Sequence, residues 1–174
     1  ARFKLYALQA YLQITLTAMR KKNWYALNYI DLQSGPGKNK IGDQIYLGSP
    51  LIALTTKASC DNYWFNELDV HHFNSLKQRV SASERASQVH YSQEDANSAV
   101  DVVMNEIETM DKHANSLGKW STFNIAFLDP EGLEINWETV EKLASAKRMD
   151  FIINFSVSGI NRNLHNPEVL NRYF

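Results

Sequence analysis

Acidic and glycine residues follow the apolar segments of this chain, at positions where an α/β protein binds ligands. The segment 31–37 reads Asp-Leu-Gln-Ser-Gly-Pro-Gly and follows an apolar stretch at 25–32. Gly35 and Gly37 permit positive φ angles and a close approach of the backbone to a ligand. Asp31 can accept hydrogen bonds from an ammonium or hydroxyl group. The alternative is a plain Ser-Gly-Pro-Gly turn.

The glycine segment is incomplete as a dinucleotide-binding or phosphate-binding motif. Lys40 stands where a third glycine of the dinucleotide fingerprint is expected. The Gly-Lys-Ser/Thr of a P-loop is also missing at the required spacing. The segment therefore favours a nucleoside-containing ligand without a pyrophosphate.

Two further apolar segments are followed by carboxylates that suit the rest of such a ligand. Glu67 ends the segment at 62–67 and Leu68 follows it, and the two carboxylate oxygens of Glu67 match the vicinal diol of a ribose. Asp95, Ala96 and Asn97 follow the segment at 88–92. Asp95 can accept the exocyclic amine of adenine, cap the next helix, or do both. For Glu67 the alternative is a solvated acid at a strand end.

A fourth group, Asp129-Pro130-Glu131-Gly132, follows the apolar segment at 124–129. Proline fixes φ and removes a donor, so the backbone there is rigid enough to position a reacting group. Asp129, or alternatively Glu131, could then orient or deprotonate an acceptor N–H or O–H. The alternative is an ordinary strand-to-helix turn.

Short apolar segments alternate with helical patterns along the chain. Helices are predicted at 49–58, 70–82, 96–117 and 137–147, and strands at 25–32, 62–67, 88–92, 124–129 and 151–155. This alternation is typical of a parallel sheet covered on both faces, and ligands then bind beyond the carboxyl ends of the strands. The expected fold is therefore a Rossmann-like α/β three-layer αβα sandwich.

The expected organisation is one domain over 1–174. An N-terminal helix lies at 1–22, with leucines spaced three and four apart, and the core spans 25–155. Residues 38–47 read as an insertion with a turn at Gly42-Asp43, followed by a helix capped by Ser49 with Pro50 as its first residue. Residues 156–174 read as the start of a truncated C-terminal part.

The net charge, the single cysteine and the lack of a long apolar run argue against several classes of protein. The net charge is −1, so the totals indicate no global attraction to nucleic acid or to an anionic membrane. The single cysteine, Cys60, allows no intramolecular disulfide and makes a cysteine-ligated zinc site unlikely, which fits a cytoplasmic protein. No apolar run approaches a membrane span.

The motifs together resemble class I methyltransferases that depend on S-adenosylmethionine (SAM). A narrower resemblance, to the three-Cys-motif partner proteins of bacteria, rests on 4–12, 29–37, Gly48-Ser49-Pro50-Leu51, 127–132 and 153–162. These proteins are named for a neighbouring radical-SAM-like protein with a three-cysteine motif. The resemblance implies a methyltransferase-like fold, of which the C-terminal strands are not visible in the sequence.

The resemblance also implies roles for the strand-end residues. Asp31 would lie near the amino group of SAM, and Glu67 with Leu68 near its ribose. Asp95, Ala96 and Asn97 would face adenine, and Asp129, Pro130 and Glu131 would border the methyl acceptor. The methionine-side pocket would be shaped by Ser34, Gly35, Pro36 and Gly37.

Three functions follow as expectations. The first is methyl transfer to a nucleic-acid base, although an aromatic ring that would stack on a flipped base is replaced by Gly132. The second is a SAM-binding or scaffold subunit, without catalysis, of the three-Cys-motif protein. The third, a nicotinamide-dependent oxidoreductase, is disfavoured by the missing third glycine.

Overall fold

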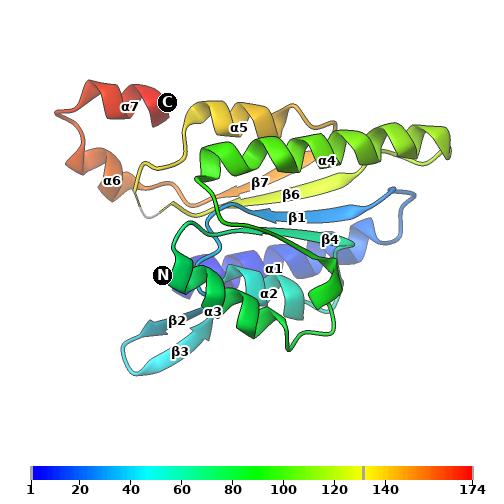
Figure 1. The fold of residues 1–174 in the computed structure, drawn as a ribbon, viewed down its shortest axis with the longest axis horizontal. Coiled ribbons are helices and arrows are strands. Elements are labelled where there is room, and N and C mark those ends of the chain that lie inside the picture. Colours follow the sequence, from blue (N-terminus) through cyan, green and yellow to red (C-terminus); the bar gives the residue numbers. More distant parts are fainter. Residues whose placement is uncertain (1, 131, 174) are drawn as a thin grey trace.

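The computed structural model describes residues 2–130 and 132–173, which form an α/β fold around a five-stranded parallel sheet (Figure 1). The strands of this sheet stand in the order β5-β4-β1-β6-β7. Their bounds are β1 Leu27–Asp31, β4 Asn62–Asn66, β5 Val89–Ser92, β6 Phe123–Leu128 and β7 Met149–Ile153. The order and direction are those of the first five strands of a class I methyltransferase sheet, so the predicted fold class is confirmed.

Helices cover both faces of the sheet and make three layers. One face carries α1 Arg2–Met19, α2 Ser49–Thr55 and α3 Val70–Val80, while the other carries α4 Ala96–Ser116 and α5 Trp137–Ala144. The short helix η1 Ala86–Gln88 precedes β5, and α6 Val157–Arg162 and α7 Pro167–Tyr173 follow β7. None of the helices in the described part is long and apolar enough to cross a membrane.

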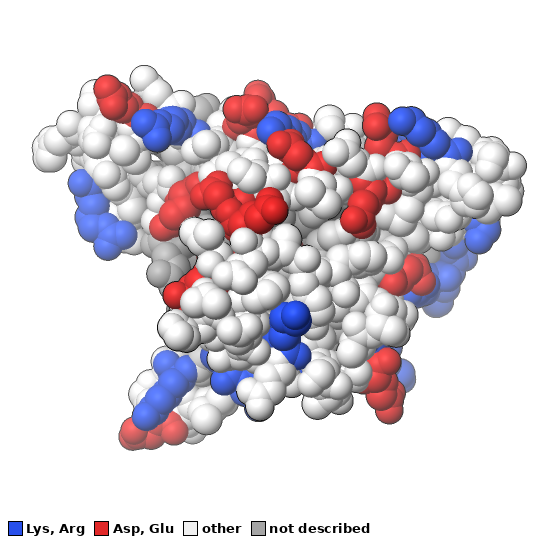
Figure 2. Space-filling view, in the orientation of Figure 1, with Lys and Arg blue, Asp and Glu red and all other residues white. Residues whose placement is uncertain are grey.

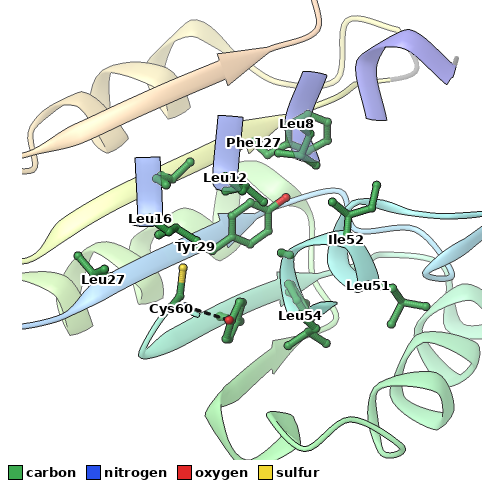
Figure 3. Packing of buried hydrophobic residues seen from close by; sticks show 14 of the residues in the cluster. Leu8, Leu12, Leu16, Leu27, Tyr29, Leu51, Ile52, Leu54, Cys60 and Phe127 are labelled. Atoms are coloured by element: carbon green, nitrogen blue, oxygen red, sulfur yellow. Dashed lines mark hydrogen bonds between the residues drawn. The ribbon is translucent and has the colours of Figure 1, made fainter. Parts of the chain in front are cut away.

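The pattern of buried residues explains why these segments form a sheet covered on both sides. Every residue of β1 and β6 is buried, as expected for central parallel strands with helices on both faces. On one face, Leu8, Leu12 and Leu16 of α1 pack over Tyr29 and Phe127 (Figure 3). The three- and four-residue spacing of these leucines thus buries one side of α1.

The insertion after β1 is a two-stranded antiparallel hairpin, β2 Lys38–Ile41 and β3 Gln44–Leu47. Gly42 has a φ of 63° in its turn, as the Gly-Asp pair predicts. Gly48, rather than Ser49, is the N-cap of α2, so that prediction is wrong by one residue. Ser49 is the first residue of the helix, and its hydroxyl hydrogen-bonds to Asp31.

Candidate functional site

The crevice where the sheet changes winding direction lies between β1 and β6. The chain passes from β1 to β4 and β5 on one side and then crosses back to β6 and β7 on the other. The loops after β1 and β6 therefore leave in opposite directions, which opens a crevice at their carboxyl ends. The predicted site residues Asp31 and Asp129 stand at this point, at the ends of neighbouring strands.

The glycine loop after β1 is held in a fixed shape. Gly35 and Gly37 have φ angles of 62° and 80°, which L-residues with a side chain rarely adopt. Ser34 is buried, its amide donates to Asn66 O at 2.9 Å, and its Oγ donates to Asp31 O at 2.9 Å. Ser34 therefore closes the turn. Its hydroxyl hydrogen is therefore already used in a bond to the backbone.

The outer side of the same loop is tied to the helices. Gly48 donates its amide to Gly37 O at 2.7 Å, and the Arg79 guanidinium of α3 donates to Pro36 O. A Cβ at Gly37 would lie 3.2 Å from Leu76 Cδ1 and 3.4 Å from Leu51 Cγ. The side of the loop that faces α2 and α3 is thus packed against these helices, and the opposite side of the loop faces the crevice.

Glu67 closes over the glycine loop from the end of β4. Its Oε2 accepts from the Gly35 amide at 2.8 Å, and its Oε1 accepts from the Asp69 amide at 2.9 Å. Each carboxylate oxygen has a second lone pair, so Glu67 can still accept from two hydroxyls. Leu68 beside it is 63% exposed and offers an apolar surface next to those acceptors.

Asn66 is a structural residue of the site that the sequence analysis did not identify. Its buried carboxamide donates to Leu32 O and Glu94 O, both at 2.9 Å. Its Oδ1 accepts from Ser92 Oγ at 2.8 Å and from the Glu94 amide at 3.1 Å. One side chain therefore holds together the loops after β1, β4 and β5. An asparagine among apolar neighbours at a strand end is the signal that could have indicated this role.

Asp31 is completely buried at the end of β1. Its pKa is raised to about 7, mainly by burial and to a smaller extent by the nearby charge of Asp129. Hydrogen bonds from Ser49, the Gln33 amide and the Tyr29 hydroxyl act in the opposite direction. A cation bound beside Asp31 would therefore favour its charged form.

Two residues after β5 have different roles: Asp95 is an exposed helix cap, and Asn97 holds a neighbouring loop in place. Asp95 is the N-cap of α4, where its Oδ1 accepts from the Asn97 amide at 2.9 Å, while Ala96 is buried. The Asn97 carboxamide donates to Glu134 O at 2.9 Å and accepts from the Asn136 amide at 2.9 Å and Thr139 Oγ1 at 2.7 Å. Asn97 thus binds the loop before α5, and this engagement argues against the adenine contact that the resemblance implied.

Substitution of Asn97 by alanine is expected to lower the free energy of unfolding by about 1–3 kcal/mol, because it leaves polar groups of the loop before α5 without their partner. Denaturant unfolding monitored by circular dichroism measures the change. Asn105→Ala, at an exposed position on the same helix, is the matched control and should change it little. Equal effects of the two substitutions would contradict the role of Asn97 as a clamp.

Asp129 lies at the end of β6 with both carboxylate oxygens occupied. Lys4 Nζ of α1 lies 2.5 Å from its Oδ2, and Asn154 Nδ2 after β7 donates to its Oδ1 at 2.7 Å. Pro130 is buried next to it, and Glu131 lies outside the described residues. The contact with Lys4 was not predicted, because nothing in the local sequence links residues so far apart.

Two surface cavities lie away from this crevice. One of about 480 Å³ lies between β4, β5 and α4 and is lined by Trp64, His90 and Met110, among others. The other, of about 560 Å³, lies behind the glycine loop between the hairpin, α2 and α3. The described residues contain no group of three or more His, Cys, Asp or Glu arranged to hold a metal ion. We place the candidate site at the strand ends, where the glycine loop and Glu67 come together, rather than in either cavity.

Comparisons with known proteins bear on the fold. No family model and no curated protein matches this chain. The crystal structure of protein LPL1258 from Legionella pneumophila, described with the family model DUF519, superposes with a TM-score of 0.62 at 15% identity, over 95% of this chain and 72% of that one. A conserved hypothetical protein from Streptococcus pyogenes aligns with a TM-score of 0.48 at 16% identity, over 74% and 62% of the two chains. The similarity to the Legionella protein shows that the two chains share a fold and shows nothing about the activity of this chain.

Proposed function

We propose that this protein binds SAM at the carboxyl ends of β1, β4 and β5 and transfers its methyl group to an acceptor beside Asp129. The observation that carries the proposal is the 2.8 Å contact between the Gly35 amide and Glu67 Oε2. This contact joins the glycine loop after β1 to the carboxylate at the end of β4. A ligand that contains a ribose beside a small polar group needs both features at one place. The methyltransferase-like fold is compatible with this cofactor.

The residues present fit SAM in kind and in position. Glu67 would hold the ribose hydroxyls, with Leu68 against apolar parts of the nucleoside. The inner side of the glycine loop would receive the methionine portion, near the buried carboxyl of Asp31. Asp95 is exposed and can accept from adenine while it caps α4. SAM supplies an activated methyl group, so the main task of the protein is to align the acceptor with it.

Asp129 is the residue that we expect to meet the acceptor. Its carboxylate side chain is 15% exposed, and the buried Pro130 fixes the backbone behind it. It would orient an acceptor N–H or take up its proton. A nucleic-acid base as the acceptor stays a prediction from the sequence, and the charges around the site, which are acidic, do not support it.

Calorimetric titration with SAM tests the cofactor assignment. We expect Glu67→Gln to weaken SAM binding by about ten- to a hundredfold, because one acceptor oxygen for the ribose becomes a donor. Glu108→Gln, an exposed position on α4, should leave the affinity unchanged. A parallel titration with NAD should show no binding, since the loop lacks the pyrophosphate motif. Equal SAM affinity in the unmodified chain and in both variants, or binding of NAD instead of SAM, would refute the proposal.

A second candidate is a SAM-binding subunit without catalysis that assembles with a three-Cys-motif protein. The observation that favours it is the occupation of both Asp129 oxygens, by Lys4 and Asn154, in the free chain. This candidate predicts SAM binding, stable co-purification with the three-Cys-motif protein and no methyl transfer to any acceptor. Methyl transfer that is lost in Asp129→Ala would decide for the enzyme.

A further inference from the structure

Three of the loops that follow the five parallel strands carry acidic residues, and none of the five carries a basic residue of its own. The sequences of these loops, 32–37, 67–69, 93–95, 129–136 and 154–156, contain no lysine or arginine. Figure 2 shows acidic side chains gathered on the face beside the first turn of α4. The described acidic residues at these strand ends are Asp31, Glu67, Asp69, Glu94, Asp95, Asp129 and Glu134. Such a rim repels a polyanion and attracts a cation.

One cation from elsewhere reaches the acceptor side of this site. Lys4 comes from the first turns of α1, which packs on one face of the sheet, and its ammonium lies 2.5 Å from Asp129 Oδ2. The side chain of Lys4 is 34% exposed and that of Asp129 is 15% exposed. An amine is therefore already bound to the carboxylate that we assign to the acceptor, at the open edge of the site, where another molecule can replace it.

The ion pair between Lys4 and Asp129 also affects the neighbouring carboxyl group of Asp31. Asp31 lies buried at the neighbouring strand end, and the charge of Asp129 acts on it. A positive group beside Asp129 thus offsets the negative charge of Asp129 that acts on Asp31. Without the Lys4 ammonium, Asp129 has no cationic partner, so a cation that takes the place of Lys4 would restore this ion pair.

We infer that Lys4 stands in for the acceptor in the free protein, and that the acceptor which displaces it is a primary or secondary amine carried as its ammonium. This inference rests on the proposed methyl transfer. In the reaction the ammonium first gives a proton to Asp129, from which it passes to solvent. The amine lone pair then forms the new N–CH₃ bond as the S–CH₃ bond of SAM breaks, which leaves a methylated ammonium and neutral S-adenosylhomocysteine.

Amine binding in the absence of SAM tests recognition separately from catalysis. Spermidine and a lysine-rich peptide would be titrated into the unmodified chain and into Lys4→Gln, Lys4→Arg and Lys112→Gln. We expect Lys4→Gln to bind the amine about fivefold more tightly, because no ion pair has to be broken. Lys4→Arg keeps the pair and should bind like the unmodified chain, as should Lys112→Gln, whose lysine is exposed on α4. Identical affinities in all four proteins would overturn the inference.

Methyl transfer then identifies the acceptor. Each protein would be incubated with labelled SAM and spermidine, the lysine-rich peptide, total tRNA or duplex DNA. Label on the peptide or on spermidine supports the inference and tells a protein side chain from a free polyamine, and label on Lys4 itself also supports it. Label on nucleic acid alone overturns it while the proposed methyltransferase stands. Failure of SAM to bind at all refutes the proposed function, and the amine titrations still decide whether Lys4 marks an amine site.

Discussion

Asp31→Asn is expected to remove a pH-dependent loss of stability between about pH 4 and pH 7. The folded-state pKa of Asp31 is raised to about 7 by burial, whereas an unfolded aspartate titrates near 3.8. Between these values the folded chain holds a proton that the unfolded chain has lost, so stability falls as pH rises and is constant above the folded pKa. The total is on the order of 4 kcal/mol. Asparagine keeps the shape without the charge.

The measurement compares denaturant unfolding of the two proteins at pH 5 and pH 8. Asp31→Asn should gain stability relative to the unmodified chain as pH rises from 5 to 8. Asp69→Asn is the control, because Asp69 caps α3, its pKa is lowered, and asparagine caps as well. Its difference from the unmodified chain should not change in this range, where the carboxylate is ionised in both states. A difference for Asp31→Asn that is equally constant would show that this carboxyl is not buried as described.

Gly37→Ala is expected to lower the free energy of unfolding by about 2–4 kcal/mol, the sum of backbone strain and overpacking. The φ of Gly37 is 80°, and a new Cβ would lie 3.2 Å from Leu76 and 3.4 Å from Leu51. The loop cannot move away easily, because Gly48 and Arg79 hold its carbonyls. Thermal unfolding of the variant measures the loss.

The variant Gly118→Ala separates the cost of backbone strain from the cost of overpacking. Gly118 also has a positive φ, of 64°, but a Cβ there meets nothing within 4 Å. This control should therefore show the cost of the backbone conformation alone, about 1–2 kcal/mol. If Gly37→Ala and Gly118→Ala cost the same, the glycine loop is not packed against α2 and α3 in the way that the structure shows.

The sequence predicted those features of the fold that depend on short-range patterns. Buried parallel strands such as β1 and β6 are mostly apolar, and helices such as α1 repeat leucine every three or four residues, so both can be recognised from the local sequence. The rule that ligands bind beyond strand ends predicted a site that includes Glu67 and the glycine loop, and the structure brings these two groups into contact. Their role as a ligand site stays a prediction.

The features that the sequence did not predict depend on contacts between distant residues. Lys4 meets Asp129 only because α1 packs on the sheet, and Asn66 joins three loops only because β4 lies between β1 and β5. Ser49 was expected to cap its own helix, but the buried carboxyl of Asp31 competes for its hydroxyl. In each case a polar group finds its partner through tertiary structure, so the partner itself cannot be identified from the neighbouring sequence.

The location of the cofactor is the central claim, and amide chemical shifts measured by NMR during titration with SAM test it most directly. We predict that the largest shift changes fall on Ser34, Gly35 and Gly37 and on Glu67 and Leu68, with smaller ones at Asp95. Changes centred instead on His90 and Met110, in the cavity between β5 and α4, would place the ligand elsewhere and contradict the account.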